Sequence, residues 1–186
     1  MKLDSRLEPL LLTVHLAALA FVLAPPVVFG AIVAPAAFRV LPTRDMAGAL
    51  QSPILSQMCG LAEASFLVLF ATSWILASES ARGTRAVMTR LPVLGFFAAL
   101  AIRQLLIPPI DRIRAEAPGL IDNLPASDPS RVLLARYHRL ATGFFTLEIA
   151  VALVVLLATA RLLSHRRSAP SIPTAVPKPE PKILDL

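Results

Sequence analysis

The chain has 186 residues, of which 56% are hydrophobic and only 16% are charged. A water-soluble domain of this size cannot cover its surface with so few polar groups, so the composition predicts a membrane protein. The formal charge of +6 comes from 18 lysines and arginines against 12 acidic residues. Because the arginines flank apolar runs, where they match lipid phosphates and set orientation, the predicted partner is the lipid bilayer and not nucleic acid.

Four apolar segments come close to the roughly 20 residues that a helix needs to cross the hydrocarbon of a bilayer. These segments are residues 10–38, 54–77, 91–107 and 140–163. We therefore predict an all-α fold, a polytopic four-transmembrane-helix bundle that occupies residues 1–167.

The first segment is longer than a membrane crossing requires. At 1.5 Å per residue it extends about 43 Å, whereas the hydrocarbon core is about 30 Å thick, so the helix must tilt or bend. Pro25 and Pro26 predict a kink near mid-membrane, and Pro35 predicts a second one near the exit. Carbonyls freed by these prolines are costly in lipid, so the bend should face protein or water. Gly30 and Ala34 are spaced for a close contact with another helix.

The connections between the four segments differ in length. Residues 39–53 and 78–90 predict two short links, and residues 108–128 predict the one sizeable loop outside the membrane. The pair Asp128–Pro129 is a typical helix start, so we expect the last helix to begin there. Residues 168–186 are rich in proline and predict an extended, disordered tail.

Three short blocks of sequence point to a family. They are "VVFGAIVAPAAFRVLPTRDMAGAL", "IPPIDRIR" and "ARYHRLATGFFTLEI". Together they resemble the bacterial membrane proteins grouped as domain of unknown function 4149, relatives of the eukaryotic transmembrane protein 205. The matching positions are Gly30, Pro35, Phe38, Gly48, Pro109, Arg114 and His138. The resemblance implies a four-helix membrane fold from about residue 10 to residue 163, and it implies no activity.

Charged residues inside the predicted spans are the candidate site. Counted from the membrane side that they share, Glu63 and Glu148 lie about 13 Å deep and Arg103 about 8 Å deep. Ionisable groups in a membrane usually face the bundle interior, so we expect these three side chains to form one buried Glu-Arg-Glu cluster. The cluster can be a purely structural link between helices, a proton or cation relay, or an anion clamp centred on Arg103.

Other polar residues are placed nearer the membrane surface. His138, Arg112 and Arg114 are predicted to be interfacial, while His15 lies toward the opposite face. The two histidines are therefore too far apart for paired axial ligation of a haem. The single cysteine, Cys59, excludes an internal disulfide, and no spacing typical of a metal or cofactor site is found.

Two classes of function remain open. A small accessory or scaffold membrane protein is favoured by the proline-rich tail and by the small-residue seam at Ser56, Gly60 and Ala64, with other membrane subunits or a second copy as partners. The alternative is a small transporter or proton- or ion-conducting bundle, favoured by the bent first helix beside buried carboxylates. The sequence contains no recognisable nucleophile–base pairing, so it does not predict an enzyme. The distribution of lysines and arginines predicts that both termini of this multi-pass protein are cytoplasmic. The resemblance to the bacterial family implies that the membrane is the bacterial inner membrane.

Overall fold

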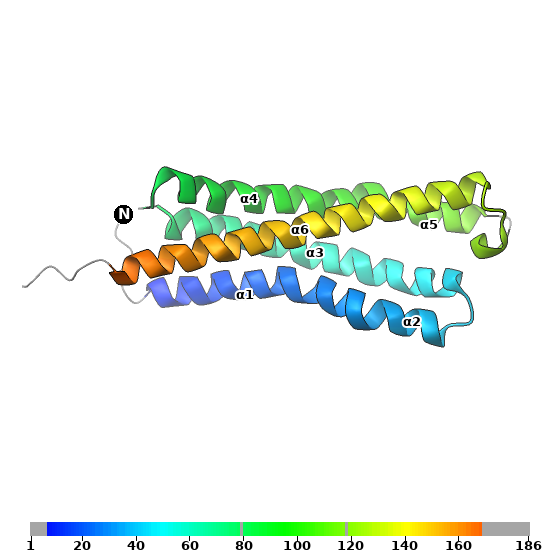
Figure 1. Ribbon diagram of the computed structural model, residues 1–186, viewed down its shortest axis with the longest axis horizontal. Helices are drawn as coiled ribbons and strands as arrows, with labels where there is room; N and C mark the ends of the chain where they lie inside the picture. The colour runs from blue at the N-terminus through cyan, green and yellow to red at the C-terminus, as the bar shows by residue number, and fades with distance from the viewer. Residues whose placement is uncertain (1–6, 79, 118, 169–186) are drawn as a thin grey trace, which may run out of the picture.

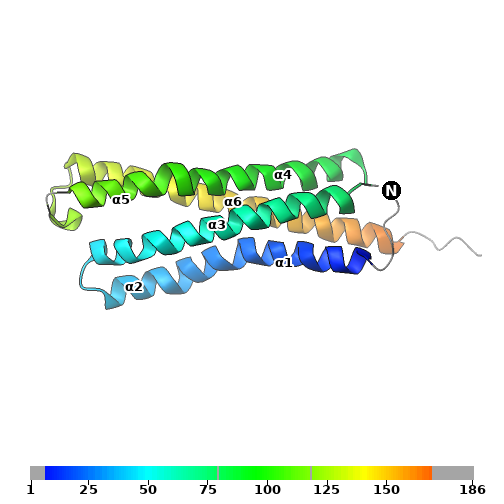
Figure 2. The ribbon, with the colours of Figure 1, turned by 180° about the vertical axis from the view of Figure 1, so that it is seen from behind.

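The computed structural model describes residues 7–78, 80–117 and 119–168, and its regular elements are all helices. They form four long rods packed as an up-and-down bundle (Figures 1 and 2). Each rod is long and apolar enough to cross a membrane: Leu7–Val40, Arg44–Leu76, Arg82–Glu116 and Pro129–His165. The prediction of an all-α, four-helix bundle is confirmed, and these spans indicate a multi-pass integral membrane protein in contact with lipid.

The first rod bends beside its prolines. It consists of α1 (Leu7–Val28), a π-helical turn η1 (Phe29–Val33) and α2 (Ala34–Val40). Pro25 and Pro26 stay inside α1, and Pro35 lies in the first turn of α2. Between them the helix widens, and the Ala34 amide donates to the Phe29 carbonyl. A wide turn accommodates a proline that has no N–H to donate, and α2 leaves α6 at this point (Figure 1).

Both predicted short links are largely helical, so their predicted bounds were wrong. Helix α3 (Arg44–Leu76) begins well before Pro53, because the Thr43 hydroxyl accepts a hydrogen bond from the Met46 amide at 3.2 Å and caps the helix start. Helix α4 (Arg82–Ala101) likewise begins within the second predicted link and contains Pro92. Packing against neighbouring helices stabilises a proline-containing helix in a bundle, so these prolines do not end it.

The third rod continues past its predicted end. After α4 come a second π-helical turn, η2 (Ile102–Leu106), and α5 (Ile107–Glu116), so the predicted loop at 108–128 is helical in its first half. In the second half, the described residues form only the short η3 (Ile121–Asn123). Helix α6 (Pro129–Ser168) starts as predicted, with the Ser130 amide donating to the Asp128 carboxylate at 2.8 Å. Residues 169–186, the predicted tail, lie outside the described residues.

An apolar layer closes the middle of the bundle. Buried side chains of α1, α3, α4 and α6 meet there: Ala18, Leu19, Val22, Ala62, Phe66, Leu69, Ala99, Val151, Ala152 and Val155. The ring of Phe66 lies against Gly95 of α4, so closely that a Cβ added at Gly95 would collide with it. This layer separates the polar groups of one half of the bundle from those of the other half.

Candidate functional site

Two of the predicted cluster residues form a direct ion pair. The Arg103 guanidinium in η2 donates to the Glu63 carboxylate of α3 at 3.0 Å, with side-chain exposures of 40% and 15%. Gly60 makes room for this contact, since a Cβ at that position would come within 3.3 Å of the guanidinium. The pair therefore neutralises two charges at the α3–η2 contact inside the apolar span.

The third predicted member of the cluster, Glu148, lies nearby but is not part of this ion pair. Glu148 of α6 is only 2% exposed, and one of its carboxylate oxygens has no hydrogen-bond partner in the described part of the chain. Its charge interacts with that of Glu63, and Glu63, Arg103 and Glu148 all act electrostatically on the buried thiol of Cys59. The structure thus brings the three residues into one region, with Arg103 paired to Glu63 and Glu148 beside them.

A histidine on the other side of the apolar layer makes a polar contact that the sequence did not predict. His15 of α1 is fully buried, with Nδ1 2.8 Å from the Thr72 hydroxyl of α3 and Nε2 3.0 Å from the Thr159 hydroxyl of α6. Each threonine hydroxyl also lies within hydrogen-bonding distance of a carbonyl of its own helix. The three side chains therefore join three rods through a satisfied buried network.

A cleft of about 710 Å³ lies in the half of the bundle away from the first and last described residues. All four rods line it. Its apolar wall includes Phe29, Phe38, Leu55, Ile110, Phe145 and Ile149. Gly30 and Ala34 also line it, and a Cβ added at Gly30 would meet nothing within 4 Å. The predicted close helix contact at these two small residues was wrong, because the bend of the first rod carries them to the cleft.

The cleft runs lengthwise through one half of the bundle and opens to the side. From Arg131 at its outer end to Ile149 at its inner end, it follows α6 for about 27 Å. One leaflet with its headgroups is about 20 Å thick, so the cleft spans one leaflet. Phe38 of α2 and Thr142 of α6 line it and are exposed, so it opens between these two helices toward the surrounding lipid.

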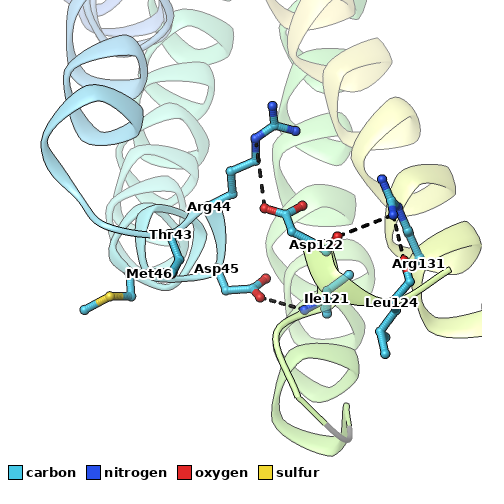
Figure 3. Close-up of polar contacts among 8 residues, drawn as sticks. All are labelled: Thr43, Arg44, Asp45, Met46, Ile121, Asp122, Leu124 and Arg131. Atoms are coloured by element: carbon cyan, nitrogen blue, oxygen red, sulfur yellow. Dashed lines mark hydrogen bonds and ion pairs between the residues drawn. The ribbon is translucent and has the colours of Figure 1, made fainter. Parts of the chain in front are cut away.

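A polar network holds the outer rim of the cleft together. Figure 3 shows the start of α3 tied to η3, where the Ile121 amide donates to Asp45 at 2.7 Å and Arg44 lies 3.9 Å from Asp122. Arg131 of α6 donates to the Leu124 carbonyl at 2.7 Å (Figure 3). The rim is therefore fixed to both α3 and α6, while the side of the cleft remains open.

Arg114, predicted as interfacial, folds back into the bundle and lines the cleft. Its guanidinium donates to the Gly48 carbonyl at 3.1 Å, and a Cβ at Gly48 would collide with it. It also lies 3.9 Å from Asp111, whose carboxylate accepts a hydrogen bond from Ser52 at 2.7 Å. The neighbouring Gln51 is buried, and it lines the cleft as well. Gln51 and Ser52 could not be singled out from the sequence, because single polar residues at the edge of a span are common.

The other two residues predicted to be interfacial lie on different helices. His138 of α6 is exposed and lines the cleft. Arg112 is exposed on α5, with Glu116 of the same helix 3.8 Å away. Among the described residues, His, Cys, Asp and Glu nowhere form a group of three able to hold a metal ion.

Comparisons with family models, curated proteins and solved structures find no match for this chain. The resemblance to the domain of unknown function 4149 family therefore stays a prediction. The class that the fold defines is a four-helix integral membrane protein with a laterally open cleft.

Proposed function

We propose that this protein is a small accessory membrane protein whose cleft holds an amphipathic molecule drawn from the surrounding bilayer. The cleft carries the proposal: its wall is apolar, it opens sideways, and charged residues line its outer end. Its volume of about 710 Å³ falls within the range of ligand sites in proteins. An occupant that is apolar along the wall and polar at the rim is an amphiphile.

An accessory role, rather than a catalytic one, also fits the polar contacts inside the bundle. The Glu63–Arg103 pair and the His15 network join neighbouring rods, as polar groups in membrane bundles commonly do. The proposed partners are the bilayer and either other membrane subunits or a second copy of the chain. The proposed location is the bacterial inner membrane, with both termini in the cytoplasm, supported by the arginine distribution and by the family resemblance.

A small transporter or proton-conducting bundle is the second candidate. One observation favours it: the inner end of the cleft is lined by Phe145 and Ile149, which flank the buried Glu148 on α6. A proton path would then have to cross the apolar layer around Phe66. Proton uptake by proteoliposomes tests this candidate, and a Glu148→Gln variant that conducts as well as the wild type excludes Glu148 from the path.

Filling the cleft tests the accessory proposal. Gly30→Leu adds a side chain at a residue that lines the cleft, and nothing lies within 4 Å of a Cβ there. We expect the purified variant to retain several-fold less co-extracted lipid than the wild type, measured by mass spectrometry after detergent exchange.

The matched control is Gly143→Leu, which changes an equally open glycine on the exposed face of α6 outside the cleft. It should retain lipid like the wild type. Equal lipid retention by Gly30→Leu and the wild type contradicts the proposal.

A further inference from the structure

Two buried hydrogen-bond donors beside the cleft have no partner among the residues that the structure describes. Gln51 is 9% exposed, and its side-chain Nε2 makes no hydrogen bond within the described part of the chain. The Nε of Arg114 is likewise buried and unpartnered there. Buried polar groups in proteins are almost always hydrogen-bonded, and a buried donor without a partner destabilises the fold. Both residues line the cleft, and a rotation of their side chains would bring the two buried donors within reach of a ligand there.

The two donors lie close together. Arg114 reaches across from α5 and donates to the Gly48 carbonyl of α3 at 3.1 Å. Gly48 is one helical turn before Gln51, so both project from the same face of α3. The guanidinium and the amide therefore flank one short section of the cleft, on the rim side of its apolar wall.

The carboxylates around this section are already engaged. Asp45 accepts from the Ile121 amide, Asp122 pairs with Arg44, and Asp111 accepts from Ser52 and lies beside Arg114. The buried groups of this section that still lack a partner are therefore hydrogen-bond donors, and a matching ligand group offers oxygen acceptors.

We propose that Gln51 and Arg114 bind the phosphate of a membrane phospholipid, whose acyl chain follows the apolar wall of the cleft. This inference rests on the proposed function of the cleft. Arginine is suited to phosphate oxygens, because its planar guanidinium presents several donors in fixed geometry. The cleft spans about one leaflet, so a lipid of that leaflet places its phosphate at the rim and its chain at the inner end, while a second chain stays in the bilayer.

Native mass spectrometry of the detergent-purified full chain tests the inference with defined probes. The probes are phosphatidylglycerol, phosphatidylcholine, diacylglycerol and inorganic phosphate. We expect one bound molecule of either phospholipid, and at least tenfold weaker binding of diacylglycerol, which lacks the phosphate. Inorganic phosphate lacks the chain and should not displace a bound phospholipid. Diacylglycerol binding as tightly as phosphatidylglycerol overturns the inference.

Two substitutions identify the recognising residues. Gln51→Leu and Arg114→Lys each remove a donor and should weaken phospholipid binding about tenfold, the usual loss for a hydrogen bond to a charged group. The matched controls are Gln57→Leu on the exposed face of α3 and Arg112→Lys on α5, both outside the cleft, which should bind like the wild type. Gln51→Leu should also keep or raise the melting temperature without lipid, because its Nε2 has no internal partner to lose.

The outcomes separate this inference from the function on which it rests. If Gln51→Leu binds phospholipid like the wild type while Gly30→Leu still loses lipid, phosphate recognition by Gln51 and Arg114 is overturned. The cleft then remains a lipid site. No lipid bound by the wild type, together with no effect of Gly30→Leu, overturns both. If Arg114→Lys fails to fold because Arg114 also contacts Gly48 and Asp111, Gln51→Leu decides the question alone.

Discussion

Single residues show how this bundle carries charge inside an apolar span. Glu63 and Arg103 stand out in the sequence because ionisable residues are rare in such segments, and counting from the helix entries placed them about 5 Å apart in depth, within reach of a long arginine side chain. Their 3.0 Å contact is therefore predictable in outline. The arrangement of Glu148 was not, because depth along a helix says nothing about the direction in which a side chain projects around it.

The Glu63–Arg103 contact predicts non-additive stability. Arg103→Leu leaves Glu63 without its cation near Glu148, so the variant should unfold more easily than either carboxylate variant. Adding Glu63→Gln should restore part of that loss, with a coupling of about 0.5–3 kcal/mol for residues in contact. Unfolding in detergent measures both effects.

Glu116→Gln in the same Arg103→Leu background is the control, since Glu116 pairs with Arg112 on the exposed face of α5. This control substitution should restore none of the stability that Arg103→Leu removes. If the effects of Arg103→Leu and Glu63→Gln simply add, the ion pair does not contribute to stability.

His15 marks the limit of sequence reasoning about single residues. Its partners Thr72 and Thr159 are distant in the sequence and lie on two other helices. A threonine in a helix satisfies its own hydroxyl with a carbonyl one turn earlier, as both of these can. Neither threonine therefore indicates from the sequence that it contacts a buried histidine. The contact is seen only once the packing of the rods is known.

At the scale of elements, the existence of the helices was predictable and their ends were not. Apolar length predicts a membrane helix because the hydrocarbon thickness is fixed. The ends depend on local capping, as at Thr43, and on prolines such as Pro53 and Pro92, which stay inside helices that neighbours support. The Asp128–Pro129 start was predictable because cap and first-position proline coincide.

The α3–α4 contact predicts opposite effects for two glycines of α4. Gly95→Ala forces its Cβ into the buried Phe66 ring, so the free energy of unfolding should fall by about 1–3 kcal/mol, as overpacking does. A Cβ added at Gly83 meets nothing within 4 Å, so Gly83→Ala should leave the free energy of unfolding unchanged or raise it by up to about 1 kcal/mol. Thermal unfolding in detergent compares them, and equal effects of the two variants contradict the packing described for Phe66.

At the scale of the whole molecule, the cleft is the feature that sequence reasoning missed. Gly30 and Ala34 were predicted to contact another helix, because small residues at this spacing usually do. The bend after Pro25 and Pro26 instead turns α2 away from α6 (Figures 1 and 2). Whether a bend opens or closes an interface depends on the paths of all four rods, which no local pattern specifies.

The orientation of the bundle predicts which leaflet supplies the lipid. The first and last described residues lie at one end of the bundle, and the cleft lies in the other half (Figure 1). In the proposed orientation, which has both termini in the cytoplasm, the cleft faces the outer leaflet. Alkaline phosphatase fused at the carboxyl end should be inactive, and the same enzyme inserted between Ala117 and Asp128 should be active. The reverse pattern would place the cleft in the cytoplasmic leaflet.

Electron paramagnetic resonance of a chain-labelled phosphatidylglycerol can detect the single bilayer lipid that we propose resides in the cleft. In reconstituted membranes the wild type should show a motionally restricted lipid component that corresponds to about one extra lipid per chain compared with Gly30→Leu. Gly143→Leu should match the wild type. An identical restricted component in the wild type and in Gly30→Leu would contradict the claim.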